Sequence, residues 1–323
     1  MYAIAFEDNN AVWRSQDDPV PASHEIVIRN YAAGINRADL IQRAGFYPAP
    51  PGASEIPGLE CAGVVSAIGN SVTQFAVGDR VCALLAGGGY AEQVLVDARH
   101  ALVIPEQLDF IQAAALPEVF ATAYLNIYIE AKAAKGESVL VHAGASGVGT
   151  AAIQICKALG NPVYVTVGSE QKRQQCMALG ALDAHDRKQG GFASSAMVWT
   201  DNKGFDVILD PVGASYLADN ISCLNLDGRL VLIGLMGGGQ ADINLASLLL
   251  KRQRVIGSTL RSRSADFKAD LISLLAKNIW SLIISGEIKP IVEKAFAIKD
   301  IDQAHQLLES NQTFGKLILT IDQ

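Results

Sequence analysis

Residues Val139–Gly160, VLVHAGASGVGTAAIQICKALG, decide the fold of this chain. An apolar, β-branched run that ends at His142 predicts a short buried strand, and the glycine-rich stretch AGASGVG predicts a tight turn after it. Apolar side chains then recur every three or four residues up to Leu159, which predicts a helix. A second apolar run, Pro162–Val167, begins two residues after that helix, as a strand–helix–strand unit requires.

The glycine turn indicates a binding site for a phosphate group. Glycines let the backbone approach a phosphate, and the first turn of the helix offers N–H groups and a partial positive charge. We therefore expect the backbone N–H groups of Ser146, Gly147 and Val148 to contact a pyrophosphate. The match to G-x-G-x-x-G is incomplete because Ser146 stands at the middle glycine position, and an ordinary strand-to-helix connection is the alternative.

Length and composition favour a two-domain globular protein. The chain has 323 residues, half of them apolar and 18% charged. A net charge of −7 disfavours nonspecific binding to nucleic acid or to an anionic membrane, although a local basic patch stays open. The apolar runs are shorter than a membrane span, and MYAIAFEDNN lacks the features of a secretion signal, so we expect a cytoplasmic protein.

The cysteines are odd in number, scattered and surrounded by apolar sequence, so buried free thiols are expected rather than disulfides. No two of them have C-x-x-C spacing, and a closed structural zinc site is not expected. They are Cys61, Cys82, Cys156, Cys176 and Cys223.

The order of the predicted elements gives the domain organisation. Residues 1–121 are rich in strand and turn signals without long helices, which predicts a mostly antiparallel, barrel-like domain. Residues 122–260 alternate strands with helices, which predicts a doubly wound parallel sheet of the Rossmann type. Residues 261–323 are too few for a domain and are expected to complete the first one. The predicted elements are helix Glu118–Glu130, strands Val139–His142, Val163–Val167, Phe205–Leu209, Arg229–Ile233 and Arg254–Ser258, helix Phe267–Ser285, strand Ile291–Phe296, helix Ile301–Glu309 and strand Lys316–Thr320.

Ligands of such parallel sheets lie at the carboxyl ends of the strands. Four segments that follow predicted strands are therefore expected to line one crevice. They are Gly168–Ser169, Asp210–Gly213, Gly234–Gly237 and Leu260–Arg263.

Several segments together resemble the zinc-independent quinone oxidoreductase branch of the medium-chain dehydrogenase/reductase superfamily, and within it the p53-inducible quinone oxidoreductase type. The resemblance covers essentially the whole chain. It implies an NADPH-dependent reductase with a GroES-like catalytic domain, a Rossmann domain and a homodimer joined through the cofactor sheets. The segments are GINRADLIQR (34–43), FYPAPPGAS (46–54), PGLECAGVV (57–65), GDRV (78–81), ALLAGGGYAE (83–92), VHAGASGVGTAAIQ (141–154), GLMGGG (234–239) and GSTLRSRS (257–264).

The same resemblance implies that zinc is absent. Asn36 and Leu59 stand where the zinc enzymes of the superfamily carry a cysteine and a histidine ligand, and Ala86–Glu92 passes directly where those enzymes insert a four-cysteine lobe. An amide is a poor zinc ligand and leucine is none. A quinone is already electrophilic, so hydride from a nicotinamide can pass to it directly in a dry, well-oriented cleft.

Two residues are the catalytic candidates. Tyr47, in the loop YPAPPG, is similar to a family position that contacts substrate and cofactor, and its phenol is a candidate proton donor; packing against the prolines is the alternative. Asn36 is a candidate hydrogen-bond partner of the ribose or of the reduced oxygen, or else a helix cap. Asp39 is expected to be a helix-start acid. Thr122 resembles a family hydroxyl that faces the nicotinamide, unless it bonds to its own helix.

The end of the second strand favours NADPH over NADH. NAD binding usually needs an acid there, whereas this chain has Gly168 and Ser169, with Lys172 one helical turn on. The family then usually supplies a tyrosine, and Arg187 stands near that place, either as its replacement or as a solvated side chain.

The resemblance implies further cofactor contacts. Arg261 is expected on the adenine side of the cofactor or against a partner subunit, with a solvated cation as the alternative. None of the five histidines has triad or metal spacing, and His142 is expected to be buried and satisfied. The remaining contacts are Gly234, Leu235, Met236, Gly237, Leu260, Ser262, Phe314 and Lys316.

The sequence leaves three functions to compare. Metal-free transfer of hydride from NADPH to a quinone leads, and reduction of an activated alkene such as an enone or 2-alkenal is the enzymatic alternative. A nucleic-acid-binding or crystallin-like structural role is the alternative of another class, but the acidic balance argues against it.

Overall fold

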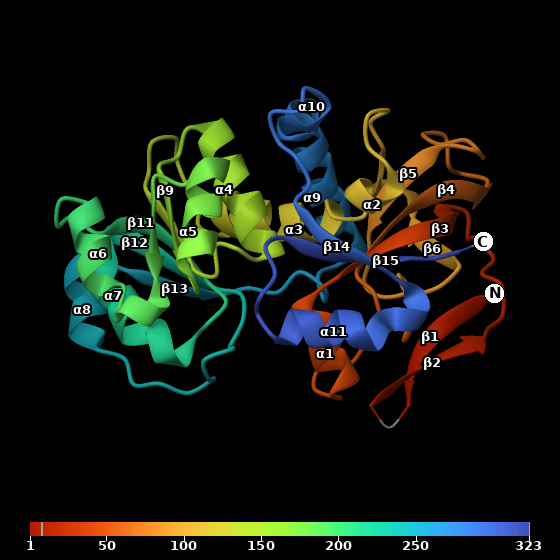
Figure 1. The fold of residues 1–323 in the computed structure, drawn as a ribbon. Coiled ribbons are helices and arrows are strands. Elements are labelled where there is room, and N and C mark those ends of the chain that lie inside the picture. The colour runs from red at the N-terminus through yellow and green to blue at the C-terminus, as the bar shows by residue number, and fades with distance from the viewer. Residues whose placement is uncertain (8, 323) are drawn as a thin grey trace. The chain divides into compact units, whose positions relative to one another are not determined.

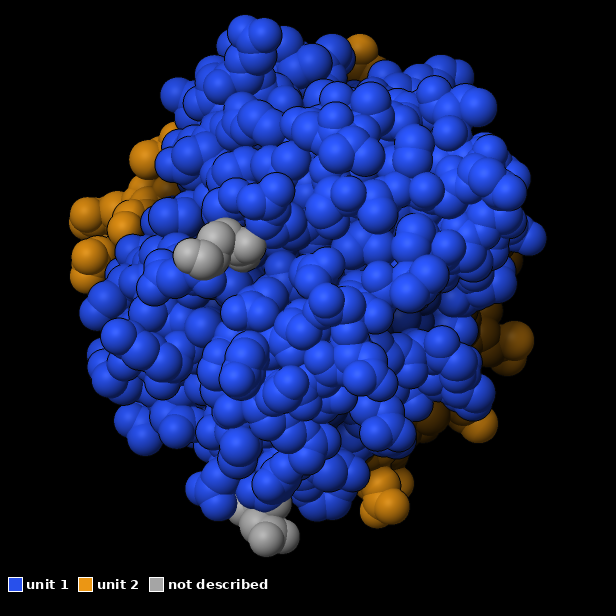
Figure 2. Space-filling model, turned by 90° about the vertical axis from the view of Figure 1, so that its right-hand side faces the viewer, with its two compact units in different colours: residues 1–121, 260–323 blue, residues 122–259 orange. Residues whose placement is uncertain are grey.

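The computed structural model describes residues 1–7 and 9–322. These residues form two compact units. Unit 1 consists of residues 1–121 and 260–323, and unit 2 of residues 122–259. The two parts of the chain that form unit 1 therefore belong to one compact body, which Figure 2 draws in blue.

Unit 2 is built on a six-stranded parallel sheet with the order β10-β9-β8-β11-β12-β13. The chain first builds outward from β8 to β10 and then returns to the other side of β8, so the strand order reverses between β8 and β11. In open sheets of this kind ligands bind at the carboxyl ends beside that reversal. The strands are β8 (Val139–Val141), β9 (Val163–Val167), β10 (Asp183–Asp186), β11 (Phe205–Asp210), β12 (Leu224–Leu232) and β13 (Arg254–Gly257).

Helices cover both faces of this sheet, as Figure 1 shows with α4 and α5 on one side and α6, α7 and α8 on the other. Both faces are therefore buried, which explains the continuous apolar runs of the central strands. The helices are α3 (Pro117–Tyr124, which continues into unit 2 as the π-helix Leu125–Glu130), α4 (Gly147–Leu159), α5 (Glu170–Leu179), α6 (Ala193–Trp199), α7 (Leu217–Cys223) and α8 (Leu245–Lys251).

Unit 1 contains a seven-stranded sheet with the path β14-β15-β3-β4-β5-β7, and β6 pairs with β3. Its pairs are antiparallel except β14 with β15. Strands β1 and β2 form a separate hairpin. The strands are β1 (Tyr2–Glu7), β2 (Asn10–Ser15), β3 (Glu25–Ile35), β4 (Glu60–Ile68), β5 (Arg80–Leu84), β6 (Gln93–Asp97), β7 (Ala101–Val103), β14 (Val292–Ala297) and β15 (Lys316–Thr320).

The return segment is part of this sheet because β15 lies between β14 and β3. Helices α1 and α11 lie side by side (Figure 1), and Arg43 of α1 forms an ion pair with Asp302 of α11 at 2.7 Å. The helices of unit 1 are α1 (Arg37–Arg43), α2 (Phe110–Ala113), α9 (Ala265–Asn278), α10 (Trp280–Ile284) and α11 (Ile301–Glu309).

The predicted architecture, a Rossmann-type parallel sheet together with a mostly antiparallel sheet, is confirmed. The five cysteines are free and buried, as expected. No helix in the described part of the chain has the length and apolar character needed to span a membrane.

Four elements differ from the prediction, and the first is β12, which begins at Leu224 rather than at Arg229. Strand β10, with the sequence DAHD, was not predicted because it shows no apolar run; pairing with β9 holds it in place. The predicted helix Glu118–Glu130 becomes a π-helix after Tyr124, and the predicted helix Phe267–Ser285 is divided at Ile279, whose φ is −121°.

Candidate functional site

The glycine turn of unit 2 presents backbone donors at the start of α4. Ser146 caps this helix by accepting a hydrogen bond from the Gly149 N–H at 3.0 Å. The N–H groups of Gly147 and Val148 lie in the first turn, where a helix provides no intrahelical acceptor. A Cβ on Gly149 would stand 2.5 Å from the Gly144 carbonyl oxygen, so this glycine serves close packing of the turn. The arrangement suits an anion held by backbone groups.

The end of β9 collects donors suited to a phosphate. Ser169 caps α5 and accepts a hydrogen bond from the Lys172 N–H at 3.3 Å, which puts Lys172 in the first turn of that helix. Arg187 lies over Gly168, with its Nε 3.4 Å from where a Cβ would stand. The structure therefore brings Gly168, Ser169 and Arg187 together. Hydroxyl and cationic donors of this kind suit a phosphomonoester.

The loop that follows β12 packs directly on the loop that follows β11. The Gly237 N–H donates to the Val212 carbonyl at 2.6 Å, and the Met236 N–H to the Pro211 carbonyl at 3.2 Å. A Cβ on Gly237 would stand 2.1 Å from the Ser215 hydroxyl, and one on Gly234 would stand 2.8 Å from the Pro211 carbonyl oxygen. These glycines are thus required for loop packing, a reason that the sequence prediction did not include. Leu235 and Met236 are exposed.

A buried polar network anchors this pair of loops. The Asp210 carboxylate accepts from the N–H groups of Val212 at 2.6 Å and Gly213 at 3.1 Å, and from the Asn220 amide at 2.9 Å. The Asn220 oxygen lies 2.7 Å from His142 Nε2. Burial raises the pKa of Asp210 to about 6, against the effect of the two backbone donors.

His142 completes the network as a neutral imidazole. Its Nδ1 lies 3.0 Å from the Thr166 hydroxyl, and burial lowers its pKa to about 4. These contacts assign the proton to Nε2, which donates to Asn220, and leave Nδ1 to accept from Thr166. The prediction of a buried, satisfied histidine is confirmed. The network itself was not predicted, because only the fold brings the four side chains together.

Thr122 begins unit 2 and is buried in α3. Its main-chain oxygen accepts a hydrogen bond from the Asn126 side chain at 2.7 Å, at the point where α3 changes into the π-helix. The predicted contact of its hydroxyl with a nicotinamide stays a prediction.

In unit 1, Lys316 is committed to internal contacts. Its Nζ donates to the Ile35 carbonyl at 2.7 Å and to the Asn36 side-chain oxygen at 2.6 Å, and it forms a 2.6 Å ion pair with Glu60. An ammonium has three N–H groups, so no donor is left for a cofactor. The predicted cofactor contact of Lys316 is therefore not supported, because its ammonium is paired with the buried Glu60.

Asn36 belongs to the same cluster. It caps α1, and its side-chain nitrogen donates to Glu60 at 3.0 Å. The same nitrogen also donates to the Gly34 carbonyl at 3.4 Å, and the side-chain oxygen accepts from Lys316. Little hydrogen-bonding capacity is left for the predicted contact with the ribose or the reduced oxygen. Glu60 also accepts the Glu118 N–H at 2.9 Å. Glu60 was missed by the sequence analysis, although a glutamate within an apolar strand was a visible signal.

Asp39 is the helix-start acid that the sequence predicts. Its carboxylate accepts from the Asn36 N–H at 2.7 Å and from the Tyr90 hydroxyl at 2.8 Å. The residue is completely buried, and this desolvation raises the pKa of its carboxyl to about 6, although both hydrogen bonds and Lys316 act in the opposite direction.

These residues do not fit a zinc ion. Within residues 1–7 and 9–322 no group of histidine, cysteine and acidic side chains is arranged to hold a metal. Asn36 and Leu59 provide no strong ligand, and the Lys316 ammonium already brings a positive charge against Asn36 and Glu60.

Tyr47 and Arg261 form a second cluster of unit 1. The Arg261 guanidinium donates to the Tyr47 carbonyl at 3.0 Å and to the Ala86 carbonyl at 2.8 Å, and it lies 5.1 Å from the centre of the Tyr47 ring. Burial raises the pKa of the Tyr47 phenol, and the Arg261 charge opposes that shift. Arg261 is buried, so the alternative of a solvated cation is wrong. Its expected contact with the adenine side or with a partner subunit stays a prediction.

The other predicted contacts of unit 1 have ordinary surroundings. Leu260 is buried and Ser262 is exposed. The Phe314 N–H donates to the Glu293 carboxylate at 3.2 Å. Their contacts with a cofactor stay predictions.

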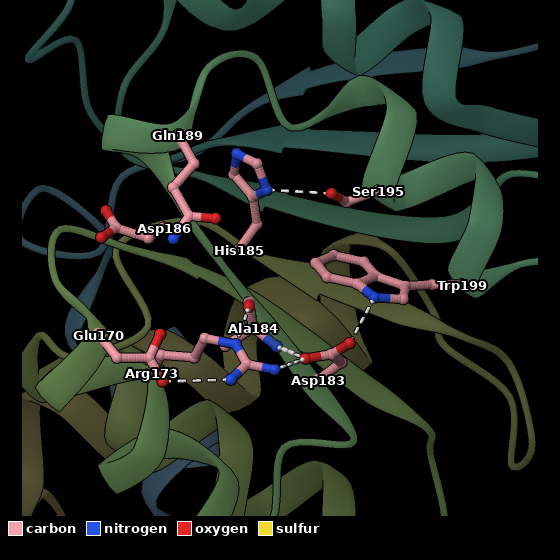
Figure 3. A pocket seen from close by; sticks show the side chains of 9 residues that line it. All are labelled: Glu170, Arg173, Asp183, Ala184, His185, Asp186, Gln189, Ser195 and Trp199. Atoms are coloured by element: carbon pink, nitrogen blue, oxygen red, sulfur yellow. Dashed lines mark hydrogen bonds and ion pairs between the residues drawn. The ribbon is translucent and has the colours of Figure 1, made fainter.

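A polar cavity of about 290 Å³ lies on the edge strand β10 (Figure 3). Its polar groups are paired with one another: Arg173 binds Asp183 at 2.9 Å, Asp183 accepts from the Trp199 indole at 2.9 Å, and His185 lies 3.0 Å from Ser195. No predicted site residue lines this cavity, and we assign it no ligand.

Known protein families and relatives match most of this chain. The alcohol dehydrogenase GroES-like domain family matches residues 22–106, and the zinc-binding dehydrogenase family matches residues 147–277. The chain is 32% identical to the quinone oxidoreductase of Rattus norvegicus over 305 residues, which covers 94% of this chain and 91% of that protein.

Solved structures give the same result. The Escherichia coli quinone oxidoreductase complexed with NADPH is 31% identical with a TM-score of 0.88, covering 99% of this chain and 100% of that one. The CurK enoyl reductase is 26% identical with a TM-score of 0.87, covering 99% of both chains.

Proposed function

Because this chain belongs to the medium-chain dehydrogenase/reductase superfamily, with quinone oxidoreductases among its full-length relatives, we propose that it is an NADPH-dependent quinone oxidoreductase. The observation that carries the proposal is the likeness over 99% of the chain to an Escherichia coli quinone oxidoreductase complexed with NADPH. The likeness includes both units, so the units proposed to hold the cofactor and the acceptor have counterparts in one known enzyme.

The donors of unit 2 support NADPH as the cofactor. The first turn of α4 offers backbone N–H groups to the pyrophosphate, and Ser169, Lys172 and Arg187 offer a hydroxyl and two cations to a 2′-phosphate. When bound, NADPH supplies a hydride from its nicotinamide ring. The loop pair anchored by Asp210 presents the exposed side chains of Leu235 and Met236 as an apolar surface for that ring.

Unit 1 supports acceptor chemistry without a metal. Lys316, a buried cation of unit 1, is bound to Glu60 and Asn36, and a metal ion does not fit beside it. Tyr47 lies on a proline-rich loop, and its phenol is the proposed proton donor to the reduced acceptor. A quinone suits such a site because it accepts hydride without activation by a metal.

Reduction of an activated alkene is the second candidate. The likeness to the CurK enoyl reductase, with a TM-score of 0.87, favours it, since the same hydride can pass to the β-carbon of an enone. Assays with NADPH and either a quinone or an enone separate the two. Turnover of the enone with no turnover of any quinone would reverse our choice.

We also propose a homodimer that forms through unit 2. Strand β13 is an edge strand with largely exposed side chains, and α8 leads directly into it with Leu245, Leu249 and Leu250 exposed. An unpaired strand edge beside apolar leucines suits pairing with a second copy.

The five free cysteines suit a reducing cytoplasm, and the net charge of −7 does not suit nucleic acid.

The test of the cofactor is a titration of NADPH and NADH against the protein and its Lys172→Ala variant. If Lys172 contacts the 2′-phosphate, the variant should lose about 1.5–3 kcal/mol of NADPH binding and keep its affinity for NADH. Lys157→Ala, at the far end of α4, is the control. Equal losses for both cofactors would remove the argument for NADPH.

A further inference from the structure

Arg261 is a buried arginine whose hydrogen-bond capacity is only partly used. Its side chain is 4% exposed. Nε and Nη1 donate to the Ala86 and Tyr47 carbonyls, whereas Nη2 is buried without any acceptor in the described part of the chain. A buried donor without a partner costs free energy that a bound acceptor atom would recover.

The charge of Arg261 is also compensated only at a distance, by the buried Asp39. It makes no ion pair with any acidic side chain among residues 1–7 and 9–322, and burial lowers the pKa of its guanidinium. A second buried cation, Lys268, donates to the Arg261 carbonyl at 2.7 Å and adds positive charge beside it. Buried charges in proteins are normally paired, so this pair of cations favours an anionic ligand.

We propose that Arg261 recognises the oxygen of the electron acceptor and stabilises the negative charge which that oxygen gains on reduction. The inference rests on the proposed function, because it assumes an acceptor bound at the Tyr47 loop. It deepens that function by naming the group that holds the acceptor oxygen, a role for which Asn36 and Lys316 lack free donors.

The electron balance of the reaction explains why a cation is useful. A hydride brings two electrons and one proton, so a quinone that receives it is one proton short of the hydroquinone and carries a negative charge on oxygen. An enone gives an enolate in the same way. The guanidinium stabilises this anion until a proton arrives from Tyr47 or from water. The guanidinium also lies over the Tyr47 ring and donates to the Tyr47 carbonyl, a combination that a lysine cannot reproduce.

The experiment compares Arg261→Ala and Arg261→Lys with Arg80→Ala in the NADPH-bound enzyme. Arg80 is a matched control, since it too lies over an aromatic ring, 5.0 Å from the centre of Phe110, and donates to a carbonyl, that of Leu108, at 2.6 Å. We expect R261A to lower kcat/KM for 1,4-benzoquinone roughly ten- to hundredfold. NADPH affinity, measured by fluorescence, should stay within about twofold, and added guanidinium should restore part of the activity.

An unchanged kcat/KM in R261A, or a parallel loss of NADPH affinity, overturns the inference. If R261A does not fold, R261K is measured in its place. This variant keeps the positive charge but lacks the planar guanidinium, so its kcat/KM should fall between those of the wild type and R261A. A second measurement does not need turnover: 4-nitrophenol is titrated in the presence of NADP⁺. The wild type should bind the phenolate and lower the pKa of 4-nitrophenol, and R261A should not. A wild type that reduces neither quinones nor enones overturns the proposed function, and the phenolate titration then still decides the role of Arg261.

Discussion

Lys316 and Lys172 are both lysines that the sequence assigns to the cofactor, yet the structure gives them different surroundings. Lys316 is buried and donates to Ile35, Asn36 and Glu60. Lys172 is only half buried and stands in the first turn of α5 beside Ser169. A motif identifies a residue type but not its partner. Glu60 lies far from Lys316 in the sequence, so no local pattern predicts the ion pair between them.

The first prediction concerns the stability of unit 1. Replacement of Lys316 by Met leaves Glu60 buried without its cation and should lower the free energy of unfolding by about 3–5 kcal/mol. NADPH affinity should not change. Urea unfolding and a cofactor titration measure the two effects, and Lys294→Met on the exposed side of β14 is the control. A variant of normal stability and reduced NADPH affinity would restore the original assignment of Lys316 to the cofactor.

The second prediction concerns pH and Asp39. Its pKa is about 6 in the folded protein and about 3.9 in an unfolded chain. The folded state therefore binds this proton more tightly, and the resulting stabilisation is complete below pH 4 and is lost as the pH rises through 6. This difference of about two in pKa corresponds to at most about 3 kcal/mol of folding free energy.

Asp39→Asn removes this titration, since the amide oxygen can still accept from Asn36 and Tyr90. Relative to wild type, the variant should become more stable by up to about 3 kcal/mol between pH 4 and pH 7. Unfolding curves of both proteins at a series of pH values measure the difference. Asp210 titrates in the same range in both proteins and cancels. A stability difference that is constant over this range would refute the role of Asp39.

Among the elements, those with a clear periodicity could be predicted and those held by tertiary contacts could not. The apolar strands β8, β9 and β11 and the amphipathic helix α11 follow their sequence patterns. Strand β10 has the polar sequence DAHD and depends on pairing with β9. The glycines of the loop after β12 were predicted to let a ligand approach the backbone. The close packing and hydrogen bonds between this loop and the loop after β11 also require them.

The hydrogen bonds between these two loops lead to the third prediction. Asp210 holds the loop after β11 through the N–H groups of Val212 and Gly213, and that loop holds residues 234–238. Asp210→Ala should therefore speed amide exchange in both loops and weaken NADPH binding by about 1–3 kcal/mol, the cost of removing a buried acceptor. Exchange mass spectrometry and a cofactor titration follow the two effects.

Asp206 provides the matched control, because it lies at the other end of β11 and accepts from Ser138 at 2.8 Å and Asn225 at 2.9 Å. Asp206→Ala should destabilise unit 2 to a similar degree without faster exchange in residues 234–238. If both variants loosen these residues equally, the effect is a general loss of stability and Asp210 has no positioning role.

For the molecule as a whole, the two edges of the parallel sheet differ in a way that favours one of them for self-association. At the β10 edge, polar side chains surround a cavity and pair with one another. At the β13 edge, the strand is exposed and the preceding helix α8 presents Leu249 and Leu250, which are 78% and 77% exposed. Apolar side chains of this size are stabilised by about 1.5–3 kcal/mol each when a partner covers them.

The fourth prediction follows from this asymmetry. The double variant Leu249→Glu with Leu250→Glu should change the proposed dimer into a monomer in light-scattering measurements, because two charges per copy would be buried at the interface. Val198→Glu is the control: Val198 is also exposed, but it lies on α6, away from β13 in the sheet order, and its variant should remain a dimer. NADPH affinity should be retained in both variants, which shows that unit 2 is folded. A monomeric wild type would contradict the dimer itself, whereas a double variant that stays dimeric would show that another surface forms it.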